Sequence, residues 1–121
     1  TLSATRAAFI SNYILNQRSK VDTALLAKSI DLARRPSNEA FKEHLLISAA
    51  QAYYAQGRVK RAFELAREVA YSNGKGKYFS LLGTWALEQD NPQVAADYFA
   101  IAKDKNQPLA AFNESIAITE T

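Results

Sequence analysis

The chain has 121 residues, a formal net charge of +3, and neither cysteine nor methionine. Its apolar fraction of 48% and charged fraction of 22% are ordinary for a globular chain and argue against disorder. Without cysteine there is no disulfide framework, thiolate metal site or thiol nucleophile. The absence of cysteine fits a reducing and an oxidising cellular compartment equally well. No apolar run approaches the ~18 residues of a membrane span, and the mild charge does not suggest a nucleic-acid-binding protein.

The first third of the chain predicts two amphipathic helices. Ser3 suits the N-cap of a helix that reaches residue 17, followed by a polar turn. Asp22 or Thr23 can cap a second helix, and Pro36 ends it because the residue before a proline disfavours helical geometry. The apolar positions available for burial are Ala7, Ala8, Ile10, Tyr13 and Ile14, then Ala24, Leu25, Ile30 and Ala33.

The rest of the chain predicts five more helices and no strand. Ser37 or Asn38 is expected to cap the third helix, and Gly57 to end it in the left-handed conformation that glycine adopts cheaply. Asn91 and Pro92 form a helix start, with proline where its missing N–H costs nothing. The expected helices are 37–56, 59–71, 77–89 and 92–105, with a loop at 72–76 and a seventh helix from about Leu109. The fold class is therefore expected to be all-α, with about seven antiparallel helices.

An internal repeat organises residues 46–108. A shift of 33 residues places Leu46 on Phe79 and Ala62 on Ala95. A fixed period of this size is typical of stacked helical hairpins, which bury their apolar faces against one another. Small residues mark the expected crossing within each hairpin, Ala50 with Ala62 and Gly83 with Ala95. Large residues are expected to fill the remaining layers: Leu46, Tyr53 and Leu65, then Phe79, Leu82, Trp85 and Phe99.

These residues resemble the tetratricopeptide repeat family. The second copy carries the family pattern at Phe79, Leu82, Gly83, Ala95, Phe99, Ala102 and, one residue late, Pro108; the first copy carries it at Tyr53, Gly57 and Ala62. Departures from the pattern are Ala50 for glycine, Ala66 for the aromatic, Gly74 for the closing proline and Ala86 for tyrosine. The resemblance implies a right-handed α-α superhelix, a solenoid.

The resemblance also implies how the chain is divided. Residues 43–75 and 76–108 are two repeats of one domain, 1–36 is a divergent helical hairpin, and 109–121 is the first helix of a further repeat or a cap. Because the chain begins at Thr1 instead of Met, we expect a processed chain or part of a longer protein. A last helix left partly uncovered at Phe112, Ile116 and Ile118 would allow self-association through that end.

In the resembled family the first helix of each repeat lines a concave groove that holds a peptide or a partner's helix. Carried over by position, the groove is lined by Ile47, Gln51, Tyr54 and Ala55 and by Ser80, Thr84, Leu87 and Glu88. The alternative is that neighbouring helices simply cover these positions. Lys77 is expected at this groove too, as the only counterpart of the family's peptide-carboxylate clamp; the other clamp places hold Ser48, Gln51, Leu81 and Thr84. A chaperone-tail clamp is not expected.

Candidate chemistry elsewhere is weak. His44 is the only histidine and has no set of ligand partners in sequence, so a metal site is not expected. The Gly74–Lys77 segment lacks both the preceding strand and the following Ser or Thr of a phosphate loop. Asn113–Ser115 matches a glycosylation triplet inside an expected helix. Arg58, Lys60 and Arg61 form a basic cluster. We expect it to be a solvated edge of the protein; the less favoured alternative is a contact with an acidic partner or a nucleic acid.

The sequence therefore predicts a protein–protein interaction scaffold that binds a peptide or partner protein on its concave face. We expect no catalytic residues, no cofactor, no metal and no small-molecule substrate. The resembled arrays are common in bacterial envelope and secretion assemblies, which favours that location, with the cytoplasm as the alternative. A second hypothesis is a regulatory or positioning arm of an enzyme or transport machine outside this chain. A third, an RNA-binding helical repeat, is disfavoured by the interspersed Glu64, Glu68 and Glu88.

Overall fold

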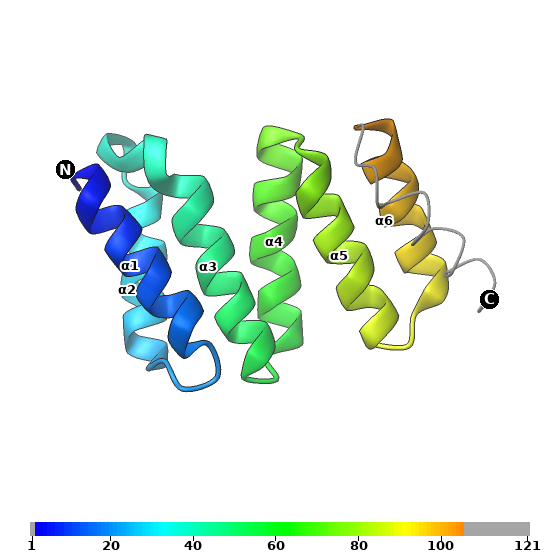
Figure 1. Cartoon of the computed structure of the whole chain (residues 1–121), viewed down its shortest axis with the longest axis horizontal. Coiled ribbons are helices and arrows are strands. Elements are labelled where there is room, and N and C mark those ends of the chain that lie inside the picture. Colours follow the sequence, from blue (N-terminus) through cyan, green and yellow to red (C-terminus); the bar gives the residue numbers. More distant parts are fainter. Residues whose placement is uncertain (1, 106–121) are drawn as a thin grey trace. The chain divides into compact units, whose positions relative to one another are not determined.

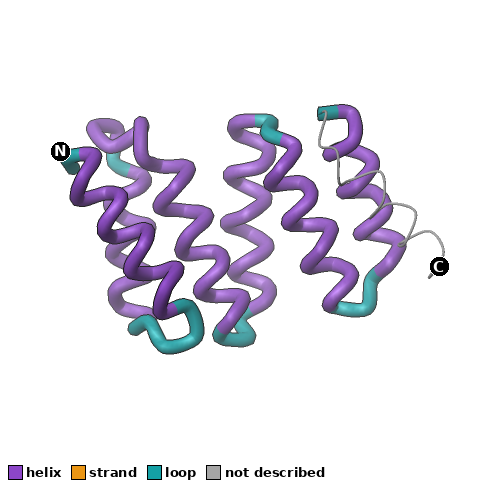
Figure 2. Tube along the Cα trace, in the orientation of Figure 1, coloured by secondary structure: helices purple, strands orange, loops and turns teal. Residues whose placement is uncertain are grey.

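The computed structural model describes residues 2–105, and within them every regular element is a helix (Figures 1 and 2). The elements are α1 (Ala4–Gln17), α2 (Thr23–Arg34), the 3₁₀ segment η1 (Pro36–Phe41), α3 (Lys42–Ala55), α4 (Val59–Asn73), α5 (Gly76–Glu88) and α6 (Pro92–Asp104). This confirms the all-α prediction for the described residues. The predicted seventh helix, its self-association surface and the Asn113 triplet lie outside them. No helix of the described part combines the length and apolar character needed to cross a bilayer.

Three of the predicted helix starts, at Ser3, Asp22 and Asn91, are confirmed by hydrogen bonds. The Arg6 backbone N–H donates to Ser3 Oγ over 3.2 Å, and that of Ala24 donates to Asp22 Oδ1 over 2.9 Å. The Val94 N–H donates to Asn91 Oδ1 over 3.4 Å, with Pro92 in the first turn of α6. Each bond satisfies a donor that the helix itself leaves unpaired.

The predicted start of the third helix is wrong. Neither Ser37 nor Asn38 caps a helix that runs to residue 56; residues Pro36–Phe41 form a 3₁₀ segment and α3 begins at Lys42. Asn38 has non-helical φ and ψ of −110° and 16° and is 2% exposed. Its side chain accepts a hydrogen bond from the Leu2 N–H over 2.9 Å and donates to the Leu32 carbonyl over 3.0 Å. These contacts hold Asn38 out of the helix.

The chain divides into two compact units, residues 1–66 and 67–121, with the boundary inside α4. In the first unit α3 packs against both α1 and α2, and η1 packs against α2 and α3 (Figure 1). Its core is largely aliphatic, and its fully buried side chains include Ile14, Leu26, Leu45 and Leu46. Gln56 fixes the end of α3, because its Nε2 donates to the carbonyls of Arg18 and Val21 over 3.0 and 2.8 Å.

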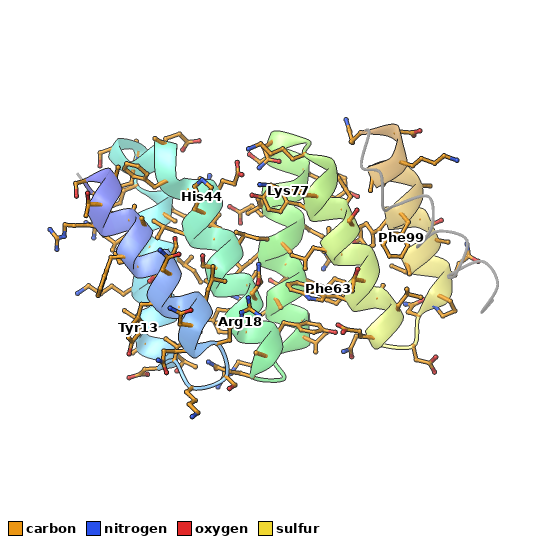
Figure 3. The ribbon with its side chains drawn as sticks, viewed as in Figure 1. Tyr13, Arg18, His44, Phe63, Lys77 and Phe99 are labelled. Carbon is orange, nitrogen blue, oxygen red and sulfur yellow. The ribbon has the colours of Figure 1, made fainter. Side chains whose placement is uncertain are left out.

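In the second unit α5 and α6 run antiparallel side by side (Figure 1). Phe79, Leu82, Trp85 and Phe99 are buried, as predicted. The ring of Phe99 lies on the α5 side of α6 (Figure 3), where it occupies the space beside Gly83. The end of α4 meets α5 through an edge-to-face pair of Tyr71 and Phe79, whose ring centroids are 5.1 Å apart.

The turns after α3 and α5 repeat one another at the predicted interval of 33 residues. Gly57 has φ of 81° and Asp90 has φ of 59°, both left-handed. The Gly57 and Asp90 N–H groups donate to the carbonyls of Tyr54 and Leu87, each over 3.0 Å. The next N–H groups, of Arg58 and Asn91, donate to Tyr53 and Ala86, each over 2.9 Å. The sequence repeat is therefore also a repeat of backbone geometry at these two turns.

Candidate peptide-binding groove

A groove of about 470 Å³, partly open to solvent, lies in the first unit between α1 on one side and η1 and α3 on the other. We call it the α1–α3 groove. Its lining consists of Ala4, Ala7, Ala8, Ser11, Asn12 and Leu15 from α1, and of Ala40, Phe41, His44, Ile47 and Ser48 from η1 and α3. Its volume is within the roughly 300–1,000 Å³ typical of ligand-binding clefts.

Small side chains on α1 create the room in this groove. Ala4, Ala7, Ala8 and Ser11 recur three or four positions apart, so they lie along one side of the helix. Ala7 is buried, whereas Ala4 and Ala8 are exposed. The α1 wall is therefore low, and it offers space for the side chains of a ligand.

The polar groups of the groove differ in whether the protein satisfies them. The Ser48 hydroxyl donates to the His44 carbonyl over 2.7 Å, so α3 uses it internally. Ser11 is 7% exposed, and its hydroxyl has no hydrogen-bond partner within residues 2–105. A buried hydroxyl without a partner costs free energy, of order 1–3 kcal/mol. Asn12 and His44 are exposed at the groove, on α1 and α3 (His44 in Figure 3).

Of the four groove positions predicted on α3, the structure places Ile47 in the lining of the α1–α3 groove, although its side chain is only 8% exposed. Gln51 lies one helical turn farther along α3 and is half-buried. Tyr54 is half-buried and Ala55 is exposed near the end of the helix. These three residues are not part of the groove lining.

The other predicted positions lie on α5 in the second unit. Lys77, Thr84 and Glu88 are exposed, whereas Ser80 and Leu87 are half-buried. The Thr84 hydroxyl donates to the Ser80 carbonyl over 2.9 Å, while the Ser80 hydroxyl has no partner among the described residues. Lys77 Nζ lies 5.1 Å from the ring centroid of Tyr78 (Lys77 in Figure 3). We call these five residues the α5 face.

The α1 wall of the groove was missed by reasoning from sequence. The family pattern is scrambled in residues 1–36, so no position on α1 could be carried over. The available signal was the spacing of Ala4, Ala8 and Ser11 on one side of α1.

Tyr13 also differs from the prediction, because it was expected to be available for burial but is 46% exposed. Its ring stacks on that of Phe9, which is 70% exposed, with ring centroids 6.5 Å apart (Tyr13 in Figure 3).

The other candidate sites considered from sequence gain no ligand set. Within residues 2–105 there is no group of three or more His, Asp or Glu side chains that could hold a metal ion. In the basic cluster Arg61 Nη1 lies 3.7 Å from Glu64 Oε2, so part of its charge is balanced locally. Gly74 has φ of 69°, and α5 begins two residues later, so the segment is a tight turn between helices.

No protein-family model, curated protein or solved structure matches this chain.

Proposed function

We propose that this chain is a protein–protein interaction module of the tetratricopeptide type, which binds an extended peptide segment of a partner protein in the α1–α3 groove. The observation that carries the proposal is the groove itself, with a low wall of small residues on α1 and an unpartnered hydroxyl at Ser11. The repeated turns at Gly57 and Asp90 support the resemblance to that family.

The lining indicates what kind of peptide the groove accepts. Leu15 and Phe41 are half-buried and offer apolar surface, to which the 8% exposed Ile47 adds little, and the alanines of α1 leave room for an aliphatic or aromatic side chain. Burial of such an anchor is the usual source of binding energy at interfaces. Asn12 and His44 are exposed and offer polar groups to the N–H and C=O groups of a peptide backbone, which lose water when the peptide binds. The Ser11 hydroxyl also belongs to the lining but is itself buried. The proposed ligand is thus a peptide with one apolar anchor flanked by unhindered backbone.

The α5 face is a second, separately tested part of the proposal. Thr84 and Glu88 lie four residues apart on exposed helix surface, and Leu87 is half-buried beside them. A partly exposed apolar side chain among polar ones is the usual composition of a contact surface. We propose that it contacts a protein partner as well.

Filling the groove without touching the core tests the proposal. Ala8 is exposed on the α1 wall, so Ala8→Arg places a long side chain in the groove and leaves the buried residues unchanged. Ala27 provides a matched control, because it is an exposed alanine on α2 that lines neither this groove nor the separate hollow between α1, α2 and η1. A displayed library of random peptides is panned on the unaltered chain, and the recovered peptides are then measured against both variants.

The proposal expects peptides with a single apolar anchor that bind the unaltered chain and Ala27→Arg with equal affinity and lose at least about tenfold with Ala8→Arg, the worth of one anchor. Ser11→Ala should weaken the same peptides to a lesser degree. Thr84→Arg with Leu87→Ala tests the α5 face on the same peptides. Peptides that bind all variants equally, or a library that yields none, would reject the groove as the binding site.

A further inference from the structure

A second hollow of about 400 Å³ lies in the first unit between α1, α2 and η1. We call it the α1–α2 pocket. It shares no residue with the α1–α3 groove, and its lining consists of Leu2, Arg6, Ile10, Leu25, Lys28, Ser29, Leu32, Arg35, Ser37 and Asn38.

Three cationic side chains line the pocket, and none of its lining residues is acidic. Arg6 comes from α1, Lys28 from α2, and Arg35 follows α2 as its C-cap. Arg35 Nη2 lies 3.0 Å from Asp31 Oδ2 in an exposed ion pair, so one of the three charges is partly balanced. Arg6 and Lys28 form no ion pair within residues 2–105. The pocket thus presents an uncompensated positive charge, which favours an anion.

The rest of the lining is largely apolar and held in place. Leu2, Ile10, Leu25 and Leu32 are all half-buried around the pocket. Asn38 fixes two of these wall residues through the backbone, because it accepts from the Leu2 N–H and donates to the Leu32 carbonyl. The wall therefore exists before any ligand arrives, which lowers the cost of ordering on binding.

A buried polar group at the pocket lacks a partner. Ser29 is 1% exposed, and its hydroxyl forms no hydrogen bond within the described residues. Most buried hydroxyls in folded proteins are bonded to protein or to water. A ligand oxygen in the pocket would provide the missing acceptor, close to the cations that attract it.

From this combination we propose that the α1–α2 pocket binds a carboxylate carried on an apolar chain. The carboxylate pairs with Arg6 and Lys28. The planar guanidinium of Arg6 can bind both carboxylate oxygens at once, and the Lys28 ammonium adds a second positive charge. The apolar chain lies against the four aliphatic residues. Two sources offer this chemistry: the C-terminal residue of a peptide that ends in an aliphatic side chain, and a free aliphatic acid. A strongly hydrated anion such as inorganic phosphate would leave the apolar wall unused.

In the test, each probe is titrated into the whole chain, and binding is monitored by the amide chemical shifts in NMR spectra. The probes are octanoate, the peptide acetyl-Ala-Leu-Leu with a free C-terminus, their neutral amides, and inorganic phosphate. At least one of the two acids is expected to shift the amide signals of Ser29 and Asn38, with its neutral amide at least about tenfold weaker, the worth of one charge-assisted bond. Which acid binds identifies the source.

Charge-matched variants separate the pocket from general electrostatics. Arg6→Gln with Lys28→Gln removes two pocket cations, whereas Arg18→Gln with Lys20→Gln removes two exposed cations of the same unit that do not line it. All four side chains are exposed, so the thermal midpoints should stay close together. The pocket pair is expected to lose at least about tenfold in affinity, because Arg6 and Lys28 line the pocket and contact the bound carboxylate directly. The control pair should lose less than about threefold, because Arg18 and Lys20 do not line the pocket and their longer-range attraction is screened by water and salt.

Four results would overturn the proposal. They are no binding by either acid at millimolar concentration, equal binding by the neutral amides, equal binding by inorganic phosphate, and an equal loss in the two double variants. A failure of the α1–α3 groove leaves this outcome unaffected, since the two hollows have no residue in common.

Discussion

The Phe99 ring lies so close to Gly83 that a Cβ atom at Gly83 would come within 2.6 Å of Cε1, 2.7 Å of Cδ1 and 2.8 Å of Cζ. Real Cβ atoms essentially never approach this closely. Gly83 on α5 therefore does more than let two helix backbones approach each other, because it also makes room for the aromatic ring of Phe99 on α6. This contact fixes α5 against α6.

Gly83→Ala should destabilise the second unit. The added methyl group forces the Phe99 ring to move, a form of overpacking that costs roughly 1–3 kcal/mol. The better helix propensity of alanine offsets about 1 kcal/mol of that. Trp85, the single tryptophan, is buried on α5 and reports unfolding of this unit through its fluorescence in urea.

Two further variants identify the mechanism at Gly83. Thr84→Ala, an exposed change on the same helix, should leave the midpoint nearly unchanged. In Phe99→Leu the smaller side chain should make Gly83→Ala almost harmless, so the two changes together are less damaging than their sum. Strict additivity would contradict the contact.

Asp90→Gly is expected to stabilise the chain. Asp90 has φ of 59°, a left-handed conformation that costs a residue with a Cβ atom roughly 1 kcal/mol and costs glycine almost nothing. The corresponding change in the other repeat runs in the opposite direction: Gly57 has φ of 81° with no atom within 4 Å of its would-be Cβ, so Gly57→Ala should destabilise by conformation alone. Thermal unfolding of both variants measures the difference, and shifts of the same sign would contradict it.

Asn38→Ala should detach the beginning of the chain and weaken η1. The side chain is buried and bridges the Leu2 N–H and the Leu32 carbonyl, so its loss leaves both groups without this partner, at a cost of about 1–3 kcal/mol. Native-state hydrogen exchange should show faster exchange of the Leu2 amide than in the unaltered chain. Glu39→Ala, at an exposed neighbour, is the control and should leave this amide unchanged.

Gln56→Ala should loosen the turn between α1 and α2. The amide of Gln56 donates to the Arg18 and Val21 carbonyls, 38 and 35 residues away in sequence. Its loss should cost about 1–2 kcal/mol, since two modest hydrogen bonds disappear. Gln56→Glu keeps the shape but removes the donors and places a carboxylate beside two carbonyls, so it should be worse. Gln17→Ala, exposed at the end of α1, is the control. Equal urea midpoints for the Ala and Glu variants at position 56 would contradict this account.

How far the sequence predicts this fold depends on how local each signal is. Ser3, Asp22 and Asn91 act within three residues of themselves, and their caps were predicted. Asn38 looks equally like a cap, yet its side chain bonds Leu2 and Leu32, and no local pattern contains the contact with Leu2. The predicted third helix therefore began too early. The α1–α3 groove shows the same dependence on local signals. Ile47 could be predicted from the repeat pattern, whereas the α1 residues of the groove could not, because nothing in the local sequence tells which helix lies opposite α3.

The position of the unit boundary within α4 has a practical consequence for dissecting the molecule. α4 is one helix of 15 residues, and the boundary between the two units falls in it, between Ala66 and Arg67 in the sequence. A cut there would leave pieces 59–66 and 67–73, each far shorter than the roughly 12–15 residues at which an isolated helix becomes even marginally stable in water. Truncated versions should instead end or begin at the turns around Gly57 or Gly74, so that each product keeps α4 whole or omits it entirely.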